Sequence, residues 1–281
     1  MTQPPMMPDQ SSPAKTRRGD ASAHLIQVAR CPIVGECLST ANPTHPCAPV
    51  VLSQWKGHSV EERVTTWERF HQLPEPWVGH LGRARILFVA SNPGRGGSPP
   101  ADPQSAASKP HFVTSDWEDD QIIDRYENAF SDYMDDGART TGASASTPYW
   151  VWVKRRATEL LPGKAVDPGS DYALTEVVRC RSKTQREGHV WKAVSTCAGL
   201  YLRGTLELSE ASVLVAVGEI AAETLAEYLQ LDDTTGVQGT MIGKRPVLVT
   251  FLAHPASSLG PKTFKGLAEG DLKRLQVALA T

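Results

Sequence analysis

Short runs of apolar, mostly branched residues alternate along the chain with longer stretches of helical spacing. Apolar runs of about four to eight residues are typical of strands that are buried on both faces. We expect four such strands, over 86–90, 172–178, 212–217 and 246–252. Because helical stretches separate them, the pattern predicts an α/β fold with a mainly parallel, four-stranded central sheet that helices cover on both faces.

Apolar residues at helical spacing mark the expected helices. These cover 59–71, 149–161, 188–208, 219–229 and 271–280, with a further helix from Asp116, as N-cap, to Met134 and another that starts near Ala23. Residues 1–23 are rich in Pro, Gln, Ser and charge, which predicts a disordered tail. We expect 24–281 to form a single domain in which 98–146 is a variable loop and helix insertion.

The composition is ordinary for a globular protein, and the 281 residues carry a formal net charge of -2. The net charge therefore does not indicate a nucleic-acid partner, although Lys and Arg cluster locally at 154–156, 179–186 and 262–273. The sequence shows neither a secretory signal pattern nor an apolar run long enough to cross a membrane. We expect a cytoplasmic monomer with no membrane partner.

Five cysteines stand out in a chain that we expect in a reducing compartment, where a disulfide framework is not favoured. Three of them fall within 17 positions of one another. This density makes metal ligation an alternative to plain burial of small side chains in a turn-rich segment. The candidate ligands are Cys31, Cys37, Cys47, Cys180 and Cys197.

Two of the predicted strands end in unusual polar turns. The first strand runs into Ser-Asn-Pro-Gly at 91–94, and the last runs into His-Pro-Ala-Ser-Ser at 254–258. Because parallel strands share a carboxyl edge, Asn92 and His254 are expected to face one crevice. Asn can orient a water molecule, and His can donate to an oxyanion that develops as a bond breaks. The alternatives are an ordinary turn and a capping histidine.

These motifs resemble those of the uracil-DNA glycosylase superfamily. Val-Ala-Ser-Asn-Pro-Gly at 89–94 is similar to the first signature, which reads Gly-Ile-Asn-Pro-Gly in the mismatch-specific branch. Leu-Ala-His-Pro-Ala-Ser at 252–257 is similar to the second, a His-Pro-Ser turn. Cys180, Cys197 and the apolar run ending in Gly218 match the layout of the iron–sulfur branch. The resemblance covers roughly Cys31 to the C-terminus, apart from 98–146.

The resemblance implies a three-layer α/β/α enzyme of base excision repair, which flips a damaged or deaminated base out of DNA and hydrolyses its N-glycosidic bond. His254 would donate to O2 of the leaving base, and Asn92 would hold the attacking water. The implied substrate-binding residues are Ser91 and Gly94 in the first turn, Phe112 as a stacking aromatic (with Tyr126 or Phe130 as alternatives), Glu176 at the base edge, and Ser257 and Ser258 at a phosphate, with Leu259 as a wedge.

The resemblance also implies a [4Fe–4S] cluster bound by four of the five cysteines, with zinc as the alternative. Cys180 and Cys197 stand where that branch places its later two ligands. The earlier two usually form a tight pair, whereas Cys31, Cys37 and Cys47 are more widely spaced.

The chain departs from the family pattern at three positions. Ala90 and Ala256 replace Gly and Ser, and Glu176 replaces an Asn that reads the base edge. An ionised Glu only accepts hydrogen bonds, so Glu176 should suit a base with an amino group better than uracil. Alternatively, Glu176 pairs with Arg179 or Arg181.

These departures also fit a second hypothesis, a catalytically inactive iron–sulfur module that binds DNA. A third, a phosphate loop at 94–97, is weaker because its spacing matches neither a P-loop nor a dinucleotide fingerprint.

Overall fold

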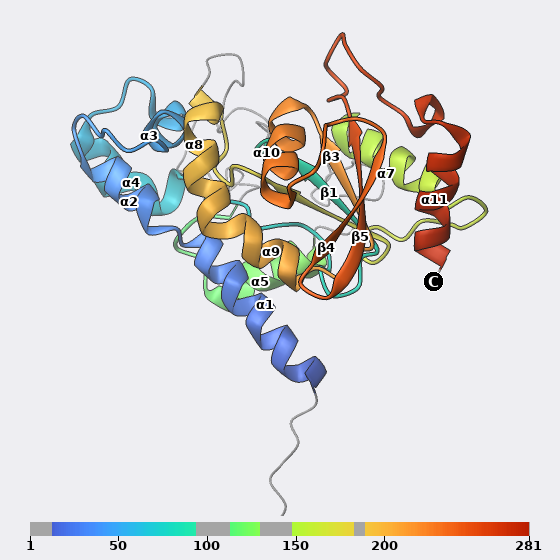
Figure 1. Cartoon of the computed structure of the whole chain (residues 1–281). Helices are drawn as coiled ribbons and strands as arrows, with labels where there is room; N and C mark the ends of the chain where they lie inside the picture. The colour runs from blue at the N-terminus through green and yellow to red at the C-terminus, as the bar shows by residue number, and fades with distance from the viewer. Residues whose placement is uncertain (1–12, 94–112, 130–147, 183–188, 281) are drawn as a thin grey trace, which may run out of the picture.

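The computed structural model describes residues 13–93, 113–129, 148–182 and 189–280, shown in colour in Figure 1. Its centre is one sheet of five strands in the order β2-β1-β3-β5-β4. The strands are β1 (Ile86–Ala90), β2 (Tyr172–Glu176), β3 (Val213–Val217), β4 (Val237–Ile242) and β5 (Arg245–Leu252). The first three and β5 run parallel, and β4 is antiparallel to β5.

The four predicted strands are all present, but the predicted strand count is wrong because β4 forms a fifth strand. Its sequence, Val-Gln-Gly-Thr-Met-Ile, lacks the continuous apolar run of the inner strands, and only its two end residues are buried. β4 is an edge strand that hairpins onto β5 through a tight turn at Gly243, whose φ is 60°. An edge strand needs only one buried face, and for that reason its signal in the sequence is weak.

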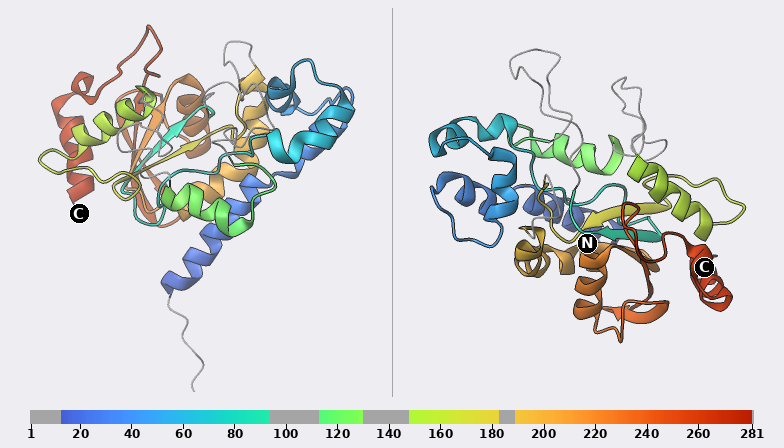
Figure 2. Two further views of the ribbon diagram at one scale, coloured as in Figure 1. Left: turned by 180° about the vertical axis from the view of Figure 1, so that it is seen from behind. Right: turned by 90° about the horizontal axis from the view of Figure 1, so that it is seen from above.

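Helices lie on both faces of the sheet, with α8 and α10 on one face and α5 and α7 on the other (Figure 2). Their bounds are α1 (Pro13–Ala29), α2 (Pro32–Ser39), α3 (Ala48–Leu52), α4 (Val60–Phe70), α5 (Asp119–Asp124), α7 (Pro148–Leu160), α8 (His189–Cys197), α9 (Arg203–Leu208), α10 (Glu219–Leu229) and α11 (Glu269–Ala280). Short 3-10 turns cover Ser53–Trp55 and Phe264–Gly266, and π-helical turns cover Arg125–Ala129 and Ala198–Leu202. No helix in these described ranges combines the length and the apolar content that crossing a membrane requires.

Three helix predictions need correction. α1 begins at Pro13, so residues 13–23, which we expected in a disordered tail, are helical. The helix expected from Asp116 begins at Asp119, with Glu118 as its N-cap, and the Glu118 N–H donates to the Gln121 side chain at 3.0 Å. The predicted helix over 188–208 is interrupted by the π-helical turn that follows Cys197.

The core lies around β1, β2 and β3, in which every position is buried. Phe88 of β1 packs edge-on against Tyr172 of β2, with ring centroids 5.9 Å apart. Burying one such aromatic side chain contributes about 2–3 kcal/mol to folding. The residues that follow these strands are therefore held by the most rigid part of the molecule.

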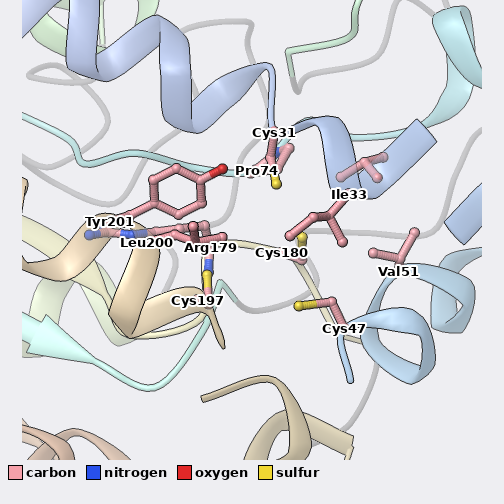
Figure 3. Close-up of a pocket in the computed structure, with 11 residues that line it drawn as sticks. Cys31, Ile33, Cys47, Val51, Pro74, Arg179, Cys180, Cys197, Leu200 and Tyr201 are labelled. Carbon is pink, nitrogen blue, oxygen red and sulfur yellow. The ribbon is translucent and has the colours of Figure 1, made fainter. Parts of the chain in front are cut away.

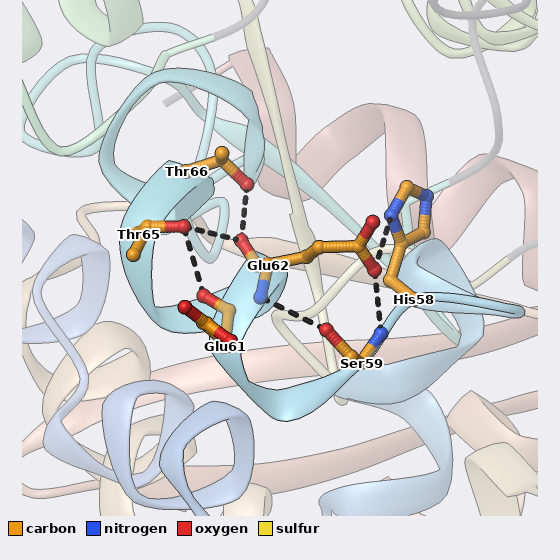
Figure 4. A network of polar contacts seen from close by, with 6 residues as sticks. All are labelled: His58, Ser59, Glu61, Glu62, Thr65 and Thr66. Carbon is orange, nitrogen blue, oxygen red and sulfur yellow. Dashed lines mark hydrogen bonds and ion pairs between the residues drawn. The ribbon is translucent and has the colours of Figure 1, made fainter.

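One local prediction concerns the start of α4 (Figure 4). The Glu62 N–H donates to Oγ of Ser59 at 3.2 Å, and the Ser59 N–H donates to the Glu62 carboxylate at 2.7 Å, which forms a capping box. Ser59→Ala should lower the free energy of unfolding by about 1 kcal/mol, because the N–H of Glu62 loses its partner. Urea unfolding measures this, with the exposed Thr65→Ala in the same helix as the control. Equal losses in both variants would contradict the prediction.

Candidate active site and cysteine pocket

The ends of four parallel strands bring the candidate catalytic residues to one edge of the sheet. Across this edge lie, in order, Glu176 at the end of β2, Asn92 after β1, Gly218 after β3 and His254 after β5. Neighbouring strands are about 4.8 Å apart, so the strands that carry Asn92 and His254 are separated by about 10 Å. Asn92 and His254 therefore lie on the same edge, as expected, with Gly218 at the end of β3 between them.

The turn that carries Asn92 is anchored to the neighbouring strand. β1 and β2 continue to pair beyond their ends, since the Val178 N–H donates to the carbonyl of Ser91 at 2.9 Å. Oδ1 of Asn92 accepts from the Ser91 hydroxyl at 3.3 Å, and Nδ2 donates to the carbonyl of Pro93 at 3.1 Å. Both Ser91 and Asn92 are buried, so these contacts hold the Asn92 side-chain amide in a defined orientation at the sheet edge.

Gly218 keeps the middle of the edge free of a side chain. Its φ is 86°, in the left-handed region that favours glycine, and its N–H donates to the carbonyl of Leu252 at 2.8 Å. A Cβ at this position would lie 3.5 Å from Cβ of His254. The glycine therefore allows β3 to turn into α10 directly beside the histidine.

His254 is half-buried and is set up as a neutral hydrogen-bond donor. Burial, and secondly the nearby Lys262 charge, lower the pKa of the imidazole, so that it is uncharged at neutral pH. Nδ1 accepts the N–H of Ala256 at 3.2 Å. In a neutral imidazole this contact assigns the proton to Nε2, which can donate to a ligand.

An aromatic column on α7 supports this histidine. The Tyr149 ring stacks on His254 with centroids 5.8 Å apart, and Trp152 stacks on Tyr149 at 6.2 Å. Arg156 covers Trp152 and donates to the carbonyl of Lys262 at 2.7 Å. The spacing of apolar residues over 149–161 predicts only a helix. The dense aromatic run Tyr-Trp-Val-Trp at its start was the feature of the sequence that could have indicated a role beside the site.

The loop after His254 is closed by its own hydrogen bonds. The Ser257 N–H donates to the carbonyl of His254 at 2.8 Å, and the Ser257 hydroxyl bonds to the carbonyl and to the N–H of Leu259. Ser258 is exposed, and Leu259 is 78% exposed. Ser257 thus shapes the turn, whereas Ser258 and Leu259 point to solvent where a large ligand would meet them.

Glu176 is buried next to a second carboxyl group, that of Glu75. Burial, and then the negative charge of Glu75, raise the pKa of Glu176, while Arg179 opposes this shift. Sequence reasoning missed Glu75, which lies in the extended 73–77 segment about a hundred residues before Glu176. No local pattern could have joined the two.

Of the two alternative partners for Glu176, Arg179 lies close enough for its positive charge to oppose the rise in the pKa of Glu176. The guanidinium of Arg179 donates to the hydroxyls of Thr175 and Thr205 and to the carbonyl of Pro76. Arg181 donates to the side-chain amide of Gln72. Two further predicted residues, Gly94 and Phe112, lie outside the described residues, as does the alternative aromatic Phe130. Tyr126, the remaining candidate, is buried beside the two glutamates.

Four of the five cysteines line one pocket beside this edge (Figure 3). Cys31 and Cys47 precede α2 and α3, Cys180 follows β2, and Cys197 ends α8. The remaining wall is mostly apolar and includes Ile33, Val34, Val51, Pro74 and Leu200. The fifth cysteine, Cys37, is fully buried within α2 and is not part of the pocket wall.

The chemistry of this pocket is that of soft, closely placed sulfur donors. Burial first, and then neighbouring thiols, raise the pKa of Cys47 to about 12, and burial raises that of Cys197 to about 11. The N–H of Arg179 donates to Sγ of Cys197 at 3.3 Å, and the Tyr201 hydroxyl bonds to Cys31. Such thiols become thiolates when a cation compensates their charge. Within the described ranges, no three His, Cys, Asp or Glu side chains are arranged to hold one metal ion.

A scan against protein-family models and a search of curated proteins find no match to this sequence.

Proposed function

We propose that the protein is a DNA glycosylase of the uracil-DNA glycosylase type, which hydrolyses the N-glycosidic bond of a flipped base. One observation carries the proposal: Asn92 and His254, whose Nδ1 accepts the Ala256 N–H, lie on either side of Gly218 on one sheet edge. The mainly parallel sheet with helices on both faces also supports the three-layer architecture that the motifs imply.

The chemistry follows from the charges that develop. The bond between C1′ and the base nitrogen breaks, its electron pair moves onto the base, and the sugar becomes cationic. His254 donates from Nε2 to the base oxygen that gains the negative charge, and this contact strengthens in the transition state. Asn92 accepts a hydrogen bond from the water whose oxygen forms the new bond to C1′. The proton that this water loses passes to solvent, and the base anion takes up one proton, so that the products are an abasic sugar and the free base. Since the imidazole is already neutral, it stabilises the leaving base without first losing a proton.

Contacts to DNA would come from the exposed loop that follows His254. Because the Ser257 hydroxyl is used within the turn, Ser258 and backbone N–H groups are the donors that remain for a phosphate. Leu259 extends from the same loop and would fill the gap that a flipped base leaves in the stack. Lys262, whose charge acts on His254, adds positive charge beside this loop.

The four pocket cysteines fit a [4Fe–4S] cluster, with zinc as the alternative. Cys31, Cys47, Cys180 and Cys197 supply four thiolates, and their sulfurs reach the pocket from separate segments (Figure 3). A bound cluster would supply cross-links that tie the N-terminal helices to β2 and α8. Cys180 follows Glu176 by four residues, so the same cross-link would fix the base-facing end of β2.

A DNA-binding module without catalysis is the second candidate, favoured by Ala90 and Ala256 at positions where the family has Gly and Ser. The test for both is base release from oligonucleotides that carry uracil, hypoxanthine, xanthine or ethenocytosine. We expect release from at least one of them. Binding to these oligonucleotides without release of any base would support the second candidate and exclude the first.

A further inference from the structure

Glu75 is fixed beside Glu176 by the backbone around it. The Glu75 N–H donates to the carbonyl of Arg179 at 2.9 Å, and the Thr175 hydroxyl donates to the carbonyl of Pro76 at 2.8 Å. Val78 then pairs with Leu174 of β2. The segment that carries Glu75 therefore runs along the end of β2, and the two carboxyl groups cannot move apart without breaking these bonds.

The ionisable groups around the pair favour one shared proton. Glu176 faces Glu75, Arg179, Tyr126 and Tyr149, and Glu75 also faces Arg125 and Arg181. The guanidinium of Arg179 donates hydrogen bonds to oxygens of Pro76, Thr175 and Thr205. These contacts reduce the stabilisation that its positive charge gives to an ionised Glu176. Two carboxylates in one buried site cannot both ionise near neutral pH.

The partners of the two glutamates decide which of them keeps the proton. One oxygen of Glu75 accepts from the side-chain amide of Gln72, a contact that favours the charged form of Glu75. No hydrogen bond to the Glu176 carboxyl is found in the described ranges. Nearby, the Tyr149 hydroxyl is buried and has no partner among the described residues. Glu176 is therefore the member of the pair that keeps the proton.

We propose that Glu176 reads the edge of the flipped base as a neutral carboxylic acid, and that Glu75 is the positioning residue that carries the negative charge of the pair. This inference rests on the proposed glycosylase function. A carboxylic acid presents one acceptor and one donor, which match N3–H and O4 of uracil as an amide would. The expectation that a glutamate disfavours uracil holds only for the ionised form.

The proposal also defines a substrate class. A carboxylic proton can reside on either oxygen, so the same group can donate to N3 of a cytosine-type base and accept from its amino group. An amide, in contrast, has its donor and its acceptor fixed once its orientation is set. We expect uracil and cytosine-derived bases to be substrates at neutral pH, and uracil release to fail as Glu176 ionises.

The experiment compares the pH dependence of uracil release, from pH ~6 to ~9, for wild type, Glu75→Gln and Glu176→Gln. In wild type, kcat/KM should fall up to about tenfold per pH unit on the alkaline side. Glu75→Gln removes the like charge that keeps Glu176 protonated, which moves this fall to lower pH. Glu176→Gln cannot ionise and should keep its uracil release at alkaline pH. A flat wild-type profile, or one that Glu75→Gln leaves unchanged, would overturn the proposal.

A second readout separates this proposal from the function on which it rests. Infrared spectra at neutral pH should show the C=O stretch of a protonated carboxyl group in wild type, and Glu176→Gln should lack it. If wild type releases no base, the glycosylase proposal fails. The infrared band and the pH dependence of binding to a uracil oligonucleotide would still show whether the Glu176 carboxyl is protonated. Absence of the band would refute a neutral Glu176 even in an active enzyme.

Discussion

His254→Ala is expected to reduce kcat for base release by about 10²–10³-fold, which corresponds to about 2.7–4 kcal/mol of lost transition-state stabilisation. The reason is that Nε2 of His254 is the donor in the proposed mechanism, because Nδ1 accepts the Ala256 N–H and the proton is therefore assigned to Nε2. Single-turnover kinetics on the best oligonucleotide of the base-release screen measure this loss. KM should change little, because the charge that His254 stabilises arises only as the bond breaks.

Asn92→Ala should produce a loss of similar size, since the attacking water would no longer be oriented. The matched control is Ser258→Ala, at an exposed position in the loop that follows His254. This variant should affect DNA binding and leave kcat close to that of wild type. If His254→Ala and Asn92→Ala both released base at the wild-type rate, the catalytic edge would have been assigned to the wrong residues.

Cys180→Ser is expected to abolish binding of the cofactor and to lower the free energy of unfolding by more than about 4 kcal/mol, the range that the loss of a structural metal produces. The four pocket cysteines come from segments that are far apart in sequence, so removing the cofactor also removes the cross-links between them. Wild type should carry about four iron atoms per chain and absorb visible light. Cys31→Ser, Cys47→Ser and Cys197→Ser should behave like Cys180→Ser.

Cys37→Ser is the control within the same set of residues. Cys37 is buried in α2 and does not line the pocket, so its replacement should keep the iron content while costing some packing energy. Iron analysis and thermal unfolding of the five variants give a complete comparison. Loss of iron in Cys37→Ser with retention in Cys47→Ser would contradict the proposed ligand set, and a colourless wild type that contains zinc would replace the cluster by the alternative metal.

Local patterns in the sequence determined the framework of the site. The apolar runs that became β1, β2 and β3 are buried on both faces, and the last four residues of β5 are buried as well. Such runs are visible without any knowledge of the fold. The polar turns after β1 and β5 stood out for the same reason, because a buried strand that ends in Asn-Pro-Gly or His-Pro is locally unusual. Parallel pairing then placed Asn92 and His254 at one edge.

Only the tertiary structure decided which distant residues contact the site residues. Glu75 lies beside Glu176, Tyr149 stacks on His254, and Cys31 and Cys47, but not Cys37, share a pocket wall with Cys180 and Cys197. Each of these contacts joins segments that are a hundred or more residues apart. Their geometry depends on how helices and loops pack on the sheet. A single sequence records the spacing of residues along the chain, and it carries no signal for such distant pairs.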